Sequence, residues 1–286
     1  MRIRAFLALP VVVAAAAFIP QASASDPTVA AIQVGLHARG LYDGPIDGIT
    51  GPATQRAIRK LQARARLTVD GVVGPKTRRA LGHFARHRLG QRPLRLGMAG
   101  WDVASLQFRL AEHGFPSADF DGIFGRHIDA ALRHFQEWAG LKADGVAGPD
   151  TLAALRGPLP TVPLPLAWPL AAPVLGDRFG PRGYKWHNGI DLPAPLGTSV
   201  YAARGGEVVW AGWRDGYGLL VTVAHGKGER TMYAHLSRID VRVGVWIGEG
   251  VRVGLIGATG DATGPHLHFE VRVRGAAVDP LRALPT

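Results

Sequence analysis

The feature that most constrains this 286-residue chain is an internal repeat, in which residues 31–81 recur without a gap as residues 105–155. The offset of 74 residues preserves a set of glutamines, Asp-Gly pairs and Gly-Pro pairs. The matched positions are Gln33 with Gln107, Asp47-Gly48 with Asp121-Gly122, Gln62 with Gln136, Asp70-Gly71 with Asp144-Gly145, and Gly74-Pro75 with Gly148-Pro149. A gapless duplication of this length predicts two copies of one small fold.

Each copy predicts three short helices. Apolar residues with helical spacing form the first helix, which ends at Gly40 in the first copy. Asp26-Pro27 supplies an N-cap and a proline in the first helical turn. The third helix of each copy begins after a Gly-Pro pair, at Pro75 and Pro149. The Asp-Gly pairs predict tight turns in which the glycine has a positive φ.

The repeated pattern reads DGxxG, then ALxxFQ, then LxxDGVxGPxT. The second copy follows it more closely, with Phe135 where the first copy has Leu61. This pattern resembles the peptidoglycan-binding domain found on many bacterial cell-wall hydrolases. The resemblance implies two all-α modules, residues 25–84 and 97–156, that bind the glycan or the stem peptide of peptidoglycan. It leaves open which side chains contact the polymer.

The first 24 residues have the layout of a secretory signal peptide. Two arginines precede an apolar run at residues 5–19, and residues 22–24 form an A-x-A cleavage site. An uncleaved membrane anchor is the alternative, but the run is shorter than about 20 residues and contains Pro10. We therefore expect a secreted protein, extracellular or associated with the cell wall, that begins at Ser25. No stable membrane insertion is expected after cleavage.

The composition limits the possible metal sites and partners. The sequence contains no cysteine, which excludes disulfide bonds and leaves histidines and carboxylates as metal ligands. The formal net charge of +11 favours attraction to an anionic polymer such as a cell wall. Nucleic acid is the competing partner, but no stretch resembles a nucleic-acid-binding module and an exported address argues against it. We expect a monomer whose partner is peptidoglycan.

A proline-rich segment separates the repeats from the rest of the chain. Residues 157–167 carry almost no charge, which predicts an extended, semi-rigid linker, with Trp168 packing on the next domain. Beyond it, short runs rich in Val, Ile, Tyr and Trp are divided by Gly, Asp and Asn. Alternation with closely spaced turn signals leaves no room for crossover helices, so we predict an antiparallel all-β domain over residues 168–286.

Two pairs of residues in this domain have spacings that suit metal ligands. His187 and Asp191 are four apart around a glycine, where a bend can bring the carboxylate toward the imidazole. His266 and His268 lie on one face of a predicted strand, so one can bind a metal while the other lies beside it. Catalytic zinc takes three N or O ligands and keeps one open position. His235 is a further candidate, and spacing alone leaves the roles of these histidines open.

Four motifs occur in order across the domain and end in VDP (278–280). They are RFGPR (178–182), HNGIDLPAPLGTSVYAARGGEVVWAG (187–212), TMYAHLS (231–237) and GLIGATGDATGPHLHFEVR (254–272). Together they resemble the lysostaphin-type zinc metallopeptidases, over essentially the whole domain. The resemblance implies one Zn²⁺ bound by His187, Asp191 and His268.

The same resemblance implies that His235 and His266 form the catalytic pair, with either one as the base, and that His225 is structural. The function it implies is a secreted zinc endopeptidase that cuts the cross-linking peptides of peptidoglycan. The alternative is a non-enzymatic regulator of other wall hydrolases, because some relatives have lost metal ligands. The presence of all five residues favours the enzyme.

Overall fold

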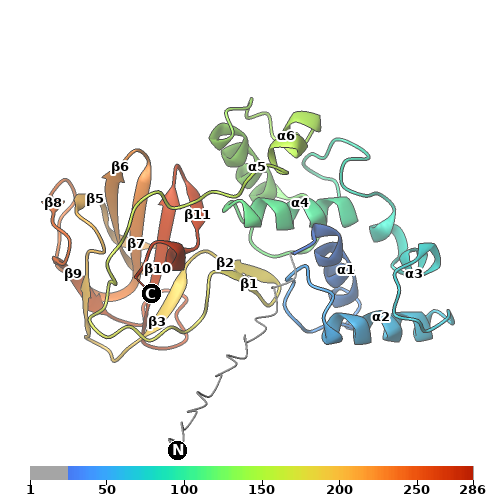
Figure 1. The fold of residues 1–286 in the computed structure, drawn as a ribbon, viewed down its shortest axis with the longest axis horizontal. Coiled ribbons are helices and arrows are strands. Elements are labelled where there is room, and N and C mark those ends of the chain that lie inside the picture. The colour runs from blue at the N-terminus through green and yellow to red at the C-terminus, as the bar shows by residue number, and fades with distance from the viewer. Residues whose placement is uncertain (1–24, 286) are drawn as a thin grey trace, which may run out of the picture.

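The computed structural model describes residues 25–285, and the expected signal peptide lies outside the described part. Figure 1 shows a helical region beside a β domain. Within residues 25–285 the helical region has six α-helices, three from each repeat, as predicted. They are α1 Pro27–His37, α2 Pro52–Arg64, α3 Pro75–Ala80, α4 Trp101–Glu112, α5 Arg126–Trp138 and α6 Pro149–Ala154. None of them is long and apolar enough to cross a membrane.

The helix boundaries follow the capping signals of the sequence. The Asp26 side chain accepts a hydrogen bond from the Thr28 N–H at 2.7 Å, and a proline occupies the first turn of α1, α2, α3 and α6. The glycine in each of the four Asp-Gly pairs has φ between 71° and 79°, a region that favours glycine. The predicted turns are therefore confirmed.

A buried glutamine holds each of these turns against the helix before it. The Gln136 amide nitrogen lies 3.0 Å from the Asp144 carboxylate and 3.1 Å from the Thr151 hydroxyl, and its oxygen accepts from the Gly145 N–H at 3.0 Å. The same engagement of an aspartate and a glycine N–H is made by Gln33, Gln62 and Gln107. The Gln…Asp-Gly unit thus occurs twice within each sequence repeat.

We expect Gln136→Leu to lower the free energy of unfolding by about 2–4 kcal/mol, because it leaves the Gly145 N–H and the Thr151 hydroxyl without their buried partner. Urea denaturation of the full chain measures the loss. Glu137→Leu, at an exposed position on the same helix, is the matched control. Equal stability of the two variants would contradict the proposed role of the glutamine.

The two modules share a hydrophobic core instead of packing as separate bodies. α1 lies along α4, and one cluster contains Leu36 of the first module together with Trp101 and Phe108 of the second. The Ser105 hydroxyl donates to the Pro27 carbonyl at 3.0 Å across the contact. The helical region therefore forms one packed unit.

The β domain is antiparallel, as predicted. Its main sheet has the strand order β11-β10-β7-β6-β5-β8, with β3 pairing with β10, and β9 pairing with β4 and β7. β1 and β2 form a separate hairpin. The strands are β1 Gly180–Arg182, β2 Lys185–His187, β3 Ile190–Pro193, β4 Ser199–Tyr201, β5 Gly206–Arg214, β6 Gly218–Gly226, β7 Glu229–Ile239, β8 Trp246–Ile247, β9 Arg252–Ile256, β10 His266–Val273 and β11 Ala276–Val278.

Strand β10 divides its side chains between two environments. Leu267, Phe269 and Val271 are at most 2% exposed and belong to the core of the domain. The alternate residues His266, His268 and Glu270 lie on the opposite face. This face is not solvated surface, because Glu270 is fully buried.

The proline-rich segment has no helix or strand, but its second half is packed on the β domain. Leu166 is buried in the β-domain core, and its N–H donates to the Ala283 carbonyl at 2.9 Å. Trp168 packs against the same core, in agreement with the sequence. The part of the segment from Val162 onward is therefore an outer layer of the domain instead of a free tether.

The β1–β2 hairpin reaches from the β domain to the helical region, as Figure 1 shows beside α1. Its Gly183 carbonyl accepts from the Ile46 N–H of the first module at 2.8 Å, and its Tyr184 carbonyl accepts from the Phe120 N–H of the second at 2.8 Å. Trp186 packs against the shared core of the modules. The hairpin therefore contacts both modules at once.

Candidate metal centre

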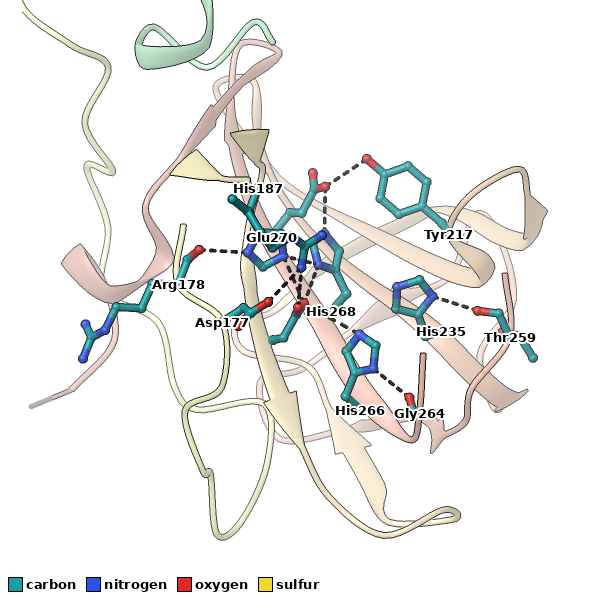
Figure 2. A network of polar contacts seen from close by, with 12 residues as sticks. Asp177, Arg178, His187, Tyr217, His235, Thr259, Gly264, His266, His268 and Glu270 are labelled. Atoms are coloured by element: carbon teal, nitrogen blue, oxygen red, sulfur yellow. Dashed lines mark hydrogen bonds and ion pairs between the residues drawn. The ribbon is translucent and has the colours of Figure 1, made fainter. Parts of the chain in front are cut away.

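Strand pairing brings three predicted ligands together. β10 pairs with β3 so that His268 is opposite Asp191, while His187 ends the β1–β2 hairpin. The Nε2 atom of His187 lies 3.0 Å from Oδ1 of Asp191 and 3.0 Å from Nδ1 of His268, and the last two atoms are 2.9 Å apart. Figure 2 shows the imidazoles of His187 and His268 side by side. The ligand atoms of all three residues lie within 4.8 Å of one another and can hold one metal ion.

The outer nitrogens of both imidazoles are engaged, which leaves the inner ones for a cation. Nδ1–H of His187 donates to the Arg178 carbonyl at 2.9 Å, and Nε2–H of His268 donates to Glu270 at 3.0 Å. The inner nitrogens therefore present lone pairs toward Asp191. Tetrahedral zinc with bonds of about 2.0–2.1 Å separates its ligand atoms by about 3.3 Å. Zinc is thus the cofactor that this donor set fits.

The bend between His187 and Asp191 depends on Gly189. A Cβ atom at this position would lie 2.2 Å from the Phe269 carbonyl oxygen, which is backbone of β10 and cannot move aside. The glycine therefore permits a close approach of two backbones. This contact lets the segment after β2 turn directly into β3 and place the two ligands side by side.

Glu270 contacts the imidazole of His268 at Nε2, the nitrogen that does not face Asp191, and the sequence did not locate this contact. Its Oε1 accepts from His268 and from the Tyr217 hydroxyl at 2.9 Å, and its Oε2 pairs with Arg272 at 2.7 Å. Burial would raise the pKa of Glu270, but the Arg272 charge and the His268 hydrogen bond lower it to about 2. Glu270 is therefore a buried carboxylate that remains ionised.

Two carboxylates make the position of the metal strongly attractive to positive charge. Burial alone would lower the pKa of His268, but its hydrogen bonds to Asp191 and Glu270, with their charges, raise it to about 9. Burial likewise opposes ionisation of Asp191, yet the hydrogen bonds from His187 and His268 hold the pKa of its carboxyl well below the usual range. The same field that favours a proton favours Zn²⁺.

His235 and His266 lie beside this group, with their rings 4.8 Å apart. Nδ1–H of His235 donates to the Thr259 carbonyl and Nδ1–H of His266 to the Gly264 carbonyl, both at 2.8 Å (Figure 2). The Nε2 atom of each neutral imidazole therefore keeps its lone pair. Burial lowers the pKa of His235, which favours this neutral form.

The backbone of His235 is in the left-handed region, with φ of 61°. This conformation is uncommon for a non-glycine residue and costs free energy. His235 nevertheless holds it, with its N–H bonded to the Tyr217 carbonyl at 2.9 Å. The left-handed backbone at His235 directly follows the last β7–β10 pair, Ala234 with His268, and changes the direction of the imidazole from the one that a regular strand would give.

Four of the five histidines in the β domain line one cleft, and the fifth, His225, does not. His225 lies apart from the metal group, because its Nδ1–H donates to the Gly205 carbonyl and its Nε2 contacts the Thr231 hydroxyl, both at 2.9 Å. The other four surround an open cleft of about 690 Å³. Its lining also includes Asn188, Tyr217 and residues 263–265 before β10.

A cleft in an antiparallel sheet, with two histidines and an aspartate that can hold a metal and with two further imidazoles beside them, is the site of a metal-dependent hydrolase. Residues 185–280 match the family described as Peptidase family M23. Residues 25–81 and 100–155 each match the family described as "Putative peptidoglycan binding domain". The chain thus carries an M23 peptidase domain behind two peptidoglycan-binding domains, and the resemblances drawn from its motifs are confirmed.

Several relatives match less than half of the chain. A DD-carboxypeptidase/endopeptidase Mpg of Neisseria meningitidis is 42% identical over 43% of this chain and 29% of its own length. The murein hydrolase activator EnvC of Escherichia coli is 38% identical over 40% of this chain and 27% of its own. A zinc-containing peptidase from Vibrio cholerae has a solved structure with 36% identity and a TM-score of 0.39, covering 41% of this chain and 40% of that one. The chain spans less than a third of the two curated relatives.

We expect the purified mature chain to bind one equivalent of zinc and His268→Ala to lose it, because two donors rarely retain the metal. Elemental analysis after dialysis measures the metal content. His225→Gln, which alters a histidine outside the group, is expected to keep one equivalent. A zinc content that is equal in the His268→Ala variant and the wild type would contradict the ligand assignment.

We expect Glu270→Gln to reduce zinc affinity by about 10- to 100-fold, because the partner of a metal-bound imidazole fixes its orientation and raises its basicity. Competition with a chelating dye measures the affinity. Glu207→Gln, at an exposed position on β5, is the control. Circular dichroism verifies that the fold is retained, and an unchanged affinity in a folded Glu270→Gln variant would rule out the support.

Proposed function

We propose that the chain is a secreted, zinc-dependent endopeptidase that hydrolyses the cross-linking peptides of bacterial peptidoglycan. One observation carries the proposal: three metal-ligating atoms and the Nε2 atoms of His235 and His266 converge in one open cleft. A protein that only bound the wall would have no use for this set. The names of the peptidase relatives support the same class of reaction.

Zinc, when bound, polarises the scissile carbonyl and lowers the pKa of a water molecule. The neutral Nε2 of His235 or His266 takes the proton of the attacking water, and the water oxygen bonds to the carbonyl carbon. The same imidazole then returns the proton to the departing amine nitrogen as the C–N bond breaks. The carbonyls of Thr259 and Gly264 keep each ring oriented through Nδ1–H during both transfers.

The two imidazoles differ in their surroundings. Nε2 of His266 lies 3.7 Å from the Asp191 carboxylate, next to the three metal-ligating atoms. His235 is more deeply buried among histidines, and its neutral form is favoured. We propose His235 as the base that takes the proton of the water and returns it to the amine, and His266 as the second imidazole that lines the reacting position.

The tandem modules would hold the enzyme on its polymeric substrate. Their match to a peptidoglycan-binding family and the basic character of the chain support this role. A cell-envelope location agrees with the names of relatives such as the murein hydrolase activator EnvC. Residues 1–24 are proposed to direct export, and the mature protein is proposed to act as a monomer.

A non-enzymatic activator of other wall hydrolases is the second candidate, favoured by the similarity to EnvC. The complete metal group distinguishes the two candidates, because an activator needs no metal-ligating atoms. The enzyme therefore remains the better-supported function.

We expect the zinc-loaded chain to release cross-linked peptides from peptidoglycan, and His235→Gln or His266→Gln to lower the rate by about 10²–10⁴-fold while retaining zinc, because each removes a proton-transfer group. Chromatography and mass spectrometry of the fragments identify the bond that is cut. His127→Gln, at an exposed position on α5, is the matched control.

If the zinc-loaded wild-type chain cuts no peptide bond, the proposed endopeptidase activity is wrong. If the same preparation accelerates another wall hydrolase, the activator is the correct function. A variant of either histidine that retains full rate would remove that residue from the mechanism.

A further inference from the structure

A second cleft, of about 900 Å³, lies between the second module and the β domain. One wall is formed by α5 and the segment after α4, including Phe115, His134 and Trp138. The other wall is the outer face of β5, β6, β7 and β10. We call it the basic cleft, since arginines at four positions line it: Arg214, Arg230, Arg272 and Arg274. Glu137 is the carboxylate among its lining residues.

The walls of the basic cleft are fixed to one another. The Ala277 N–H donates to the Gly114 carbonyl at 3.0 Å, and a Cβ on Gly114 would lie 2.2 Å from the Ala277 carbonyl oxygen. Arg274 donates to the Trp138 carbonyl at 2.9 Å and lies 5.9 Å from the Trp138 ring. The cleft is therefore a built feature of the packed chain.

One of the four arginines in the basic cleft has a side chain without a partner among the described residues. Arg230 and Arg272 are directly opposite each other on β7 and β10, and like charges in this arrangement repel. Arg272 is neutralised by Glu270. The Arg230 side chain is exposed and makes no hydrogen bond or ion pair with any residue in the range 25–285. Its guanidinium is thus free to form a bidentate pair with a carboxylate from outside.

The basic cleft adjoins the metal-site cleft. Tyr217 and Asn188 line both, and Asn188 directly follows the ligand His187. The side-chain oxygen of Asn188 is buried and has no hydrogen-bond partner among the described residues. A buried acceptor without a donor costs free energy unless a ligand supplies one. A peptide N–H that passes between the clefts would satisfy it.

Exposed aromatic surface completes the basic cleft. Trp210 on β5 is 43% exposed, and it lies next to Thr222, which is next to Met232, across the same face of the sheet. A flat aromatic ring beside arginines is suited to the apolar face of a sugar whose neighbouring groups carry carboxylates. This combination matches an acidic peptide attached to a glycan more closely than it matches a purely anionic polymer.

We propose that the basic cleft binds a muropeptide segment of the substrate, with Arg230 paired to a stem-peptide carboxylate and Trp210 against a sugar ring. This proposal rests on the proposed function, because it places the uncut part of the polymer beside the bond that is hydrolysed. The occupant runs past Asn188 into the metal-site cleft. The second module therefore forms one side of the substrate site, in addition to binding the bacterial cell wall.

The test uses an uncross-linked disaccharide tetrapeptide, which contains no cross-link to be cut, and the zinc-loaded full chain in a calorimetric titration. We expect Arg230→Gln and Trp210→Ala each to weaken binding about tenfold, as loss of a charge-assisted pair or an aromatic contact would. Arg242→Gln and Trp213→Ala, exposed residues of the same types outside the cleft, are expected to bind as the wild type does.

A ligand with amidated stem carboxylates isolates the proposed ion pair. The amidated ligand should bind the wild type about tenfold more weakly than the unmodified ligand does. The two ligands should bind the Arg230→Gln variant equally, because the variant and the amidation remove the same contact. Additive losses, an Arg230→Gln variant with wild-type affinity, or tighter binding of poly(glycerol phosphate) than of the muropeptide would each overturn the proposal.

The binding result is independent of hydrolysis. If the chain binds the muropeptide through Arg230 but cuts no peptidoglycan, the proposed binding site is supported and the proposed peptidase activity is contradicted. If the chain cuts peptidoglycan and the Arg230→Gln variant binds the muropeptide as well as the wild type does, the proposed binding site is contradicted and the proposed peptidase activity stands.

Discussion

The pairing of β10 with β3 on one side and β7 on the other is the constraint on which the functional part of the molecule depends. One pairing sets His268 opposite Asp191, and the other sets it opposite Ala234, directly before His235. A shift of one residue would move His268 and Glu270 into the apolar core and expose Phe269. The burial of alternate side chains of β10 therefore also fixes the metal group.

Local patterns in the sequence determine much of the fold. The Asp26 cap and the prolines at helix starts specify the helices through contacts within one turn, and the alternation in β10 separates its two faces. The grouping of His187, Asp191 and His268 was predictable because their motifs resemble a family. Spacing alone left the roles of His266 and His268 undecided, since both point from one face of one strand.

Features that depend on distant packing were not accessible in this way. Glu270 shares the polar side of β10 with His268, yet its burial depends on a distant contact, the hydroxyl of Tyr217, as well as on Arg272 of the same strand. The proline-rich segment reads as a spacer, but Leu166 is buried in the β-domain core and Leu164 packs against it. The close approach that requires Gly189 involves the backbone of a strand 80 residues away. Each of these depends on which elements meet.

The hairpin that ends in His187 has a mechanical consequence for the whole molecule. The hairpin is hydrogen-bonded to both modules, and its Trp186 packs against their shared core. The metal group is therefore held in a fixed position relative to the modules, and packed side chains fix the distance between them. In the proposed enzyme this fixed distance would limit cleavage to cross-links that lie at one separation from the part of the wall held by the modules.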